Sequence, residues 1–483
     1  MTISRIVVCL AAMATTAVAA PPSVTIEHAT TTAENGERVA CDHGLLHVRE
    51  NRDDPKSATI TISFARLPAT RPTGAPPIVF LPGGPGASYD DAFTATTGNG
   101  RRRLAMFRRY AEAADVIVMD TRGFSPRGFR LADPPVQPRA AGRASSVADA
   151  IGEWKAYAAA AIAANPGHDL GGYTLVQVAA DVDELRAALG YRTISLLGTS
   201  FGSQTSLAVM RLYPGTVSRA VLSGVEPIDF GFDKPSDVAA ALERIAADAD
   251  RAPELKPYLP PGGMMATIRA LIARFEAGPI RVSLAGEREP VVLGLEDLQA
   301  WLVPEEDAAD WPGFVLSLYR GHYEEWARKE LASRRALLFS TPNNPLIDSS
   351  IAASPARIRD LRADPARKLL GDWQLEPHVG SRAAWPTKDI GDLRTFERSD
   401  IPVVMIQGDW DTSTPIENMQ TLARFFTHAH TIVVHRGEHG TPIRLAREAP
   451  AAVSAILEFF RSGSTTKLPH ELALATPRFA LPH

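Results

Sequence analysis

The chain has 483 residues, of which 45% are hydrophobic and 22% are charged, and its formal net charge is −4. These proportions are typical of a folded globular protein and exclude a largely disordered chain. The near-neutral charge argues against general binding to nucleic acid, and the lack of an 18-residue apolar run argues against stable membrane insertion. The length predicts two or three domains, or one large domain with an insertion.

The N-terminal segment has the features of a secretory signal peptide. Ile6–Ala20 is an apolar stretch too short for a membrane-spanning helix, and Ala17–Ala19 supplies the small residues that a signal peptidase recognises. We therefore expect residues 1–19 to be a signal peptide and the mature protein to be secreted or periplasmic. Cys9 would leave with this segment, so Cys41 would have no disulfide partner and is expected to be a small buried side chain.

Strand-like segments follow, and their pattern changes along the chain. Leu45–Val48 and Ala58–Leu67 are separated by a polar turn and predict an antiparallel hairpin. Beyond them, short apolar runs alternate with helical stretches such as Thr174–Gly190, as expected for strands buried on both faces. The alternation predicts an α/β fold with a mostly parallel sheet. The runs are Ile78–Leu81, Val116–Met119, Ile194–Leu197, Ala220–Leu222, Val403–Ile406 and Ile432–Val434.

The alternation stops at about residue 227 and returns only near residue 397. Between these points the sequence predicts helices joined by proline-rich links, which favours a helical cap (227–396) inserted between two parts of one core. The two core parts are then residues 20–226 and 397–465. Residues 466–483 are expected to form an extended tail on the surface. The predicted cap helices lie near 236–250, 264–276, 307–318 and 322–334.

A Gly-x-Ser-x-Gly motif, Gly198–Gly202, lies between a buried strand-like run and a helical stretch. This is the context of a nucleophile elbow, in which a sharp turn exposes the serine hydroxyl and needs small neighbours. We interpret Ser200 as the nucleophile, against the alternative of a glycine-rich turn with a helix-capping serine. The Phe201 N–H would start the following helix and could stabilise an oxyanion.

A second oxyanion donor is expected in the loop Leu81–Gly86, LPGGPG, directly after an earlier strand-like run. Its two prolines stiffen the loop and lack N–H groups, whereas its glycines let backbone donors approach a substrate. We expect the donor to be Gly84.

A serine nucleophile needs a base, and the base needs an orienting carboxylate. Asp411 follows one late strand-like run and His439 follows the next, 28 positions further on, so the order is Ser200, Asp411, His439. That order is the one found in α/β-hydrolases. Asp409 and His435 remain the rival acid and base.

The segments LPGGPG, DTRGFS (Asp120–Ser125), GTSFGS, GDWDTSTP and GEHG resemble those of α/β-hydrolases of the proline iminopeptidase and tripeptidyl aminopeptidase family. The resemblance is greatest to the exported tripeptidyl-aminopeptidase-like branch. It implies an α/β-hydrolase core with a helical cap, and release of N-terminal residues or short peptides through an acyl-enzyme. It also implies Ser200, Asp411 and His439 as the triad and Gly84 and Phe201 as oxyanion donors, and it leaves Asp120 and Arg122 outside the site.

Two departures concern the specificity of the predicted enzyme. Pro82 stands where the family usually has a histidine, as in the tripeptidyl branch, and the cap lacks cysteines that exported relatives often carry. An aminopeptidase also needs a carboxylate to hold the substrate's α-ammonium group. Glu226, just past the run Ala220–Leu222, is a candidate, although it could instead cap a helix or pair with an arginine of the cap.

The sequence therefore predicts an exported serine hydrolase whose partner is a peptide or small ester substrate, with its oligomeric state open. A carboxylesterase is the first alternative, and a catalytically inactive binding protein is the second. No cofactor is expected, because neither a phosphate-binding nor a dinucleotide-binding glycine motif occurs. No metal is expected either, because the pair His428 and His430 has no third ligand at a suitable spacing.

Overall fold

The computed structural model describes residues 23–94, 97–304 and 308–483, so the predicted signal peptide lies outside the described residues. Within these ranges one sheet has the strand order β1-β2-β3-β5-β4-β6-β7-β10-β11-β12. The strands are β1 (Ser23–Thr32), β2 (Arg38–Arg49), β3 (Thr59–Leu67), β4 (Ile78–Leu81), β5 (Val116–Met119), β6 (Ile194–Thr199), β7 (Val217–Ser223), β10 (Val403–Gly408), β11 (Ala429–His435) and β12 (Glu471–Ala473).

The sheet has an antiparallel end and a parallel remainder. β1, β2, β3 and β5 pair antiparallel in that order, which confirms the predicted hairpin as β2 and β3. From β5 through β4, β6, β7, β10, β11 to β12 every pairing is parallel. All six predicted apolar runs lie in strands of this parallel part, so the predicted α/β fold class is confirmed.

Helices cover both faces of the sheet because alternate strand residues point to opposite sides. Val79 and Leu81 pack in a core with α4, α5 and α15, whereas Ile78 and Phe80 pack in a second core with α2 and α17. Cys41 is 3% exposed in the second core, as expected. The helices outside the cap are α1 (Asp91–Thr94), α2 (Gly98–Tyr110), α3 (Val147–Ala164), α4 (Leu175–Ala188), α5 (Phe201–Leu212), α15 (Ile416–Ala423), α16 (Thr441–Glu448) and α17 (Pro450–Ser462).

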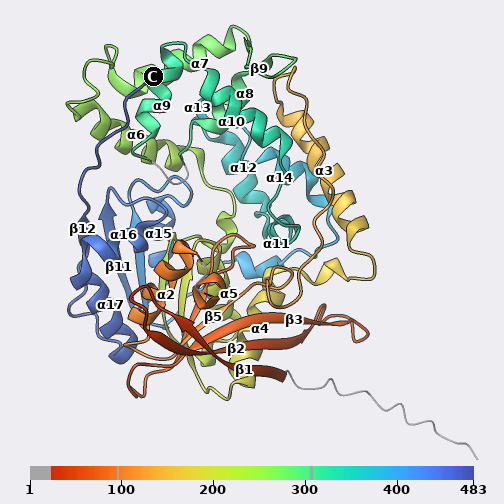
Figure 1. The fold of residues 1–483 in the computed structure, drawn as a ribbon, viewed down its shortest axis with the longest axis vertical. Helices are drawn as coiled ribbons and strands as arrows, with labels where there is room; N and C mark the ends of the chain where they lie inside the picture. Colours follow the sequence, from red (N-terminus) through yellow and green to blue (C-terminus); the bar gives the residue numbers. More distant parts are fainter. Residues whose placement is uncertain (1–22, 95–96, 305–307) are drawn as a thin grey trace, which may run out of the picture.

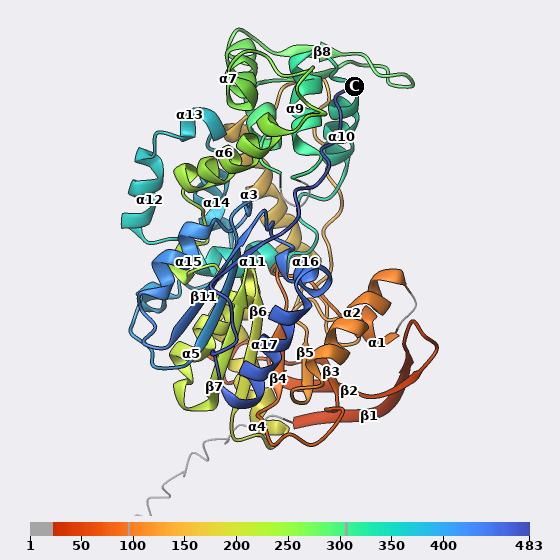
Figure 2. The same ribbon diagram turned by 90° about the vertical axis from the view of Figure 1, so that its left-hand side faces the viewer.

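Between β7 and β10 the chain leaves the sheet and forms a helical layer above its carboxyl edge (Figures 1 and 2). We call residues 227–396 the cap segment. Four predicted helices are present as α6, α7, α9 and α10, whereas the other helices and a small hairpin were not predicted. Its elements are α6 (Pro235–Arg251), α7 (Gly263–Glu276), β8 (Ile280–Val282), β9 (Val291–Leu293), α8 (Leu295–Trp301), α9 (Trp311–Tyr319), α10 (Glu324–Arg335), α11 (Asn343–Ile351), α12 (Pro355–Ala363), α13 (Arg367–Leu370) and α14 (Glu376–Ser381).

Short 3-10 turns link several of these elements. They are η1 (Leu170–Gly172), η2 (Pro214–Thr216), η3 (Ile228–Phe230), η4 (Arg382–Ala384) and η5 (Gly391–Arg394). None of the helices formed by the described residues combines the length and apolar character needed to cross a lipid bilayer.

The C-terminal tail, expected to be extended on the surface, makes contacts with the sheet and the cap segment that the sequence did not predict. Residues of β12 extend the sheet beside β11. The chain then runs to the cap segment, where the C-terminus lies (Figure 1). Phe479 is 2% exposed in the apolar core of the cap segment, and its ring centroid lies 6.2 Å from that of Trp410. The Ala480 N–H donates to the Ala309 carbonyl at 3.0 Å. Burial of this aromatic ring therefore holds the extended tail against the cap segment.

The tail is expected to stabilise the association of the cap segment with the core. Phe479→Ala should lower the free energy of unfolding by about 3–5 kcal/mol, the usual cost of removing a buried phenylalanine ring. The control Leu481→Ala, at a position 45% exposed, should change it by less than ~0.5 kcal/mol. Guanidinium unfolding followed by fluorescence measures both, and equal small effects would contradict the anchoring role.

Candidate active site

Ser200 lies at a sharp turn between β6 and α5. Its backbone has φ 56° and ψ −128°, a conformation that residues with a side chain rarely adopt. The two glycines of the motif are required by close backbone contacts. A Cβ atom on Gly202 would lie 1.9 Å from the Leu81 carbonyl oxygen, and one on Gly198 would lie 2.3 Å from the Gly202 carbonyl oxygen. The turn therefore has the geometry of a nucleophile elbow.

Hydrogen bonds on both sides hold the Ser200 backbone in this conformation. The Ser200 N–H donates to the Ser223 carbonyl at the end of β7 (3.0 Å). The Ser200 carbonyl accepts from the Ser203 N–H at 2.6 Å and from the Ser203 hydroxyl at 2.7 Å. The elbow is thus tied to both the neighbouring strand and the first turn of α5.

Asp411 is 1% exposed and fully engaged as a hydrogen-bond acceptor. Its Oδ1 accepts the backbone N–H groups of Ser413 (3.0 Å) and Thr414 (2.9 Å). Its Oδ2 accepts the Gln407 side-chain amide and the Thr414 hydroxyl, both at 2.8 Å. Gln407 and Thr414 were not singled out from the sequence. Donors on several sides fix the carboxylate in one orientation.

The imidazole of His439 lies against this carboxylate, with Nδ1 3.0 Å from Asp411 Oδ2 and 3.2 Å from Oδ1. An ionised carboxylate only accepts hydrogen bonds, so this contact assigns the proton to Nδ1 and leaves Nε2 as the basic nitrogen. A Cβ atom built on Gly224 would lie 3.0 Å from His439 Cε1 and 3.2 Å from the Ser200 nitrogen. The structure therefore brings the predicted Ser200, Asp411 and His439 together at the carboxyl edge of the sheet.

The rival acid and base, Asp409 and His435, have other partners than Asp411 and His439. His435 Nδ1 lies 2.8 Å from Asp409 Oδ2, and His435 Nε2 lies 3.8 Å from Glu471 on the edge strand β12. The other Asp409 oxygen accepts the Arg436 N–H at 2.7 Å. The two rival residues thus pair with each other, while Asp411 pairs with His439.

The predicted oxyanion donors lie around Ser200 on two separate segments. Phe201 is the first residue of α5, where backbone N–H groups have no partner within the helix. A Cβ atom on Gly83 would lie 3.1 Å from Ser200 Cβ and 3.6 Å from its Oγ, so the LPGGPG loop lies directly beside the hydroxyl. Gly84 follows at φ 112°, and its role as the second donor stays a prediction.

Asp120 and Arg122 have structural partners, as the resemblance implied. Asp120 accepts the hydroxyl groups of Ser63 (2.5 Å) and Ser88 (2.6 Å). The Arg122 guanidinium is fully buried and forms an ion pair with Asp181 at 2.6 Å. These contacts hold the loop after β5 without involving Ser200.

Glu226 follows β7 next to the elbow, and its N–H donates to the Ser203 hydroxyl at 2.9 Å. Among the described residues its carboxylate has neither a hydrogen bond nor an ion pair. Burial raises its pKa well above the usual range, and the nearby carboxylates of Asp233, Asp348 and Asp411 raise it further. The site thus contains a carboxylate whose ionised form lacks a compensating cation.

Asp233 and Asp348, both in the cap segment, were not expected from the sequence. Burial raises the pKa of Asp233 to about 7, although Asn418 donates a hydrogen bond to its Oδ1 at 3.0 Å. Burial also raises the pKa of Asp348 to about 8. Neither residue stands in a recognisable local motif, and only the folded cap segment brings them near Glu226.

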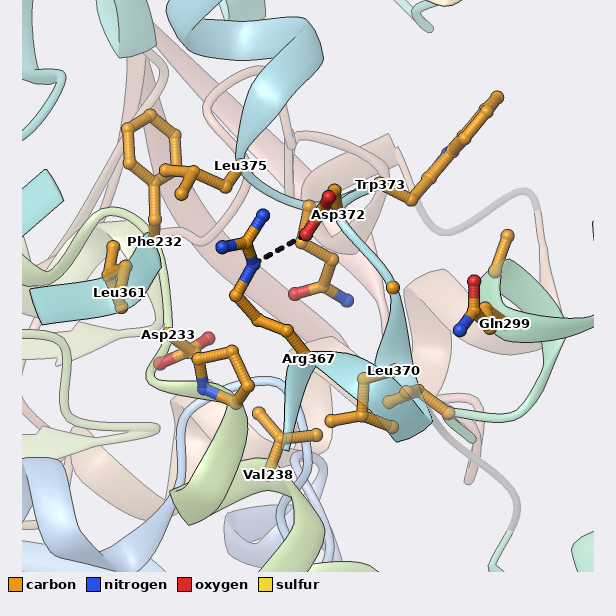
Figure 3. Close-up of a pocket in the computed structure, with 15 residues that line it drawn as sticks. Phe232, Asp233, Val238, Gln299, Leu361, Arg367, Leu370, Asp372, Trp373 and Leu375 are labelled. Carbon is orange, nitrogen blue, oxygen red and sulfur yellow. Dashed lines mark hydrogen bonds and ion pairs between the residues drawn. The ribbon is translucent and has the colours of Figure 1, made fainter. Parts of the chain in front are cut away.

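Asp233 also borders a cavity of about 50 Å³ within the cap segment (Figure 3). In the close-up, the Arg367 side chain lies across this cavity and pairs with Asp372, with Nε and Oδ1 2.5 Å apart. Phe232, Val238 and Leu375 supply apolar walls. Arg367 and Asp372 thus compensate each other's charge in this cavity, whereas Asp233 forms no ion pair among the described residues.

Comparison with known proteins gives two family matches. Residues 76–252 match the family described as alpha/beta hydrolase fold, and residues 375–470 match the family described as TAP-like protein. Serine protease Hip1 of Mycobacterium tuberculosis (strain ATCC 25618 / H37Rv) and that of Mycobacterium bovis are each 26% identical over 227 residues. That similarity covers 42% of this chain and 41% of the relative, so the chain matches less than half the length of these curated relatives.

Similar solved structures include a thermophilic esterase from Thermogutta terrifontis and an esterase from Exiguobacterium antarcticum. They are 15% and 11% identical, with TM-scores of 0.37 and 0.38, and each alignment covers 86% of this chain and 98% of the other. The two family matches contain the strands that precede Ser200, Asp411 and His439. The chain therefore has the α/β-hydrolase fold, with an earlier part similar to alpha/beta hydrolases and a later part similar to TAP-like proteins.

Proposed function

We propose that this protein is an exported aminopeptidase that releases N-terminal residues or short peptides through an acyl-enzyme on Ser200. The observation that carries the proposal is the Glu226 carboxylate, which lies beside the nucleophile elbow without a counterion among the described residues. A substrate with a free α-ammonium group supplies that counterion, whereas a neutral acyl ester does not. The match to TAP-like proteins and the distant similarity to a serine protease support the same reaction class.

In this mechanism His439 Nε2 accepts the proton of the Ser200 hydroxyl as its oxygen attacks the carbonyl carbon of the peptide bond. Asp411 holds the imidazole and stabilises its protonated form. The N–H groups of Phe201 and Gly84 stabilise the oxyanion. His439 then protonates the departing amine, and the acyl group remains on Ser200. Water, activated by His439, attacks this ester and regenerates the free hydroxyl.

Export is part of the proposal and rests on the apolar stretch and small-residue pattern within residues 1–19. The isolated Cys41 is compatible with it, because a buried thiol without a partner makes no demand on the redox state of the compartment.

Loss of the nucleophile should abolish the reaction. Ser200→Ala is expected to lower kcat on an alanyl arylamide by about 10⁴-fold or more, because it removes the group that forms the acyl-enzyme. A fluorophosphonate probe should label the wild-type protein and the exposed-surface control Ser464→Ala but not Ser200→Ala. Failure of the probe to label the wild-type protein would favour a catalytically inactive binding protein.

Glu226→Gln should weaken recognition of the free amine selectively. We expect kcat/KM on an unblocked alanyl arylamide to fall about 10–100-fold, because a charge-assisted hydrogen bond is lost. Hydrolysis of a short acyl ester should change less than about threefold, and the wild-type enzyme should cleave the N-acetylated arylamide poorly. Ester cleavage without any arylamide cleavage would instead indicate a carboxylesterase.

The preference for free amines should depend on pH. Burial raises the pKa of Asp233 to about 7 and that of Asp348 to about 8, so these carboxyl groups become negatively charged as pH rises through these values. The ratio of kcat/KM for the unblocked arylamide to that for the ester should therefore rise between about pH 6 and 8. It should fall above about pH 8, where the substrate's own amine loses its proton. A ratio that is flat from pH 5 to 9 would contradict the electrostatic role.

A further inference from the structure

A second cavity, of about 150 Å³ and with an aromatic lining, lies between the cap segment and α3. Its walls include Trp154 of α3, Phe232, and His378 of α14, together with Trp385. The His378 ring centroid lies 4.4 Å from that of Trp154 and 4.9 Å from that of Phe232. A cavity of this size holds a group as large as a benzene ring.

Asp348 of α11 contributes a carboxylate to this aromatic wall. Within residues 23–94, 97–304 and 308–483, no side chain or backbone group forms a hydrogen bond or ion pair with that carboxylate. Arg382 also lines the cavity, but its guanidinium is engaged by Asp389 and by the Ser349 carbonyl. Burial lowers the pKa of His378 to about 4, so its imidazole is neutral at neutral pH. When Asp348 is ionised, its negative charge therefore has no compensating partner among the described residues.

Helix α11 connects this cavity to the LPGGPG loop. The Asn344 side-chain amide donates to the Pro85 carbonyl at 3.1 Å. Asp348 follows four positions later, so it lies about 6 Å further along the same face of the helix. Its charge also raises the pKa of Glu226, as expected for two carboxylates in one region. In both ribbon views α11, α3 and α14 lie together between the sheet and the upper cap helices (Figures 1 and 2).

We propose that this cavity binds the cationic side chain of an arginine or lysine within the released N-terminal part of the substrate. The proposal rests on the proposed aminopeptidase function and adds a substrate class to it. The α-ammonium group of a substrate carries one positive charge, which Glu226 can pair. A basic side chain supplies a second positive charge, which favours the ionised form of Asp348. Aromatic rings favour that cation, because a guanidinium or ammonium group is attracted to their faces.

The test is a set of Ala-Ala-Ala arylamides in which arginine, or its neutral isostere citrulline, replaces each alanine in turn. At one position the wild-type enzyme should prefer arginine over citrulline by about tenfold or more in kcat/KM. Asp348→Asn should bring that ratio close to one, because kcat/KM on the arginine substrate falls to the value for the citrulline substrate. The control Asp360→Asn removes a charge from an exposed position on α12 and should keep the ratio.

A ratio near one at every position, or a ratio that Asp348→Asn leaves unchanged, would overturn the proposal. If no arylamide is cleaved, the aminopeptidase function itself is wrong, and the cavity is then tested on ester hydrolysis. Argininamide should inhibit that reaction at a concentration about tenfold lower than citrullinamide, and Asp348→Asn should remove the difference. Equal inhibition by the two amides would reject the cavity as a cation site. Circular dichroism of each variant verifies that it is folded.

Discussion

The arrangement of the active site depends on one close backbone approach, that of Gly202 to the Leu81 carbonyl at the end of β4. Because no side chain intervenes, the first turn of α5 packs directly onto the LPGGPG loop. This contact places the Ser200 hydroxyl beside Gly83 and fixes the first N–H groups of α5 near the same loop. The unfavourable φ of Ser200 is a local cost that the surrounding hydrogen bonds offset. The elbow therefore stores backbone strain at the carboxyl end of β6.

The carboxyl groups around Glu226 also lower the stability of the folded protein, because their charges are buried. Asp233 and Asp348 keep their protons in the folded protein up to about pH 7 and 8, whereas an ordinary aspartate loses its proton near 3.8. Between these values the unfolded chain binds fewer protons than the folded one, so stability decreases as pH rises through this window. These buried carboxyl groups therefore destabilise the free protein. Binding of a cationic substrate at the same place would restore that stability.

The local patterns that could be read from the chain are those with short-range causes. Buried parallel strands need continuous runs of Val, Ile and Leu, so Ile78–Leu81 and Val116–Met119 coincide with β4 and β5. The small cap elements escaped prediction because α13, β8 and β9 are only three or four residues long. The anchoring of the tail was not predicted, because it depends on one buried ring, that of Phe479. Single long-range contacts of this kind leave no periodic signal.

The features of the active site can likewise be separated into those that the sequence indicates and those that the tertiary structure decides. The positions of Ser200, Asp411 and His439 could be inferred from the sequence alone, because each follows a strand and the order of the three is tied to the topology. Which carboxylate pairs with which imidazole was decided by tertiary structure, since Asp409 and Asp411 are two residues apart and each finds its own histidine. The same holds for Gln407, which donates to Asp411 and accepts from the N–H of Val225 beside Glu226. Asp348 acquires its environment only when α3, α11 and α14 enclose it, because burial and the absence of a counterion are properties of the assembled fold.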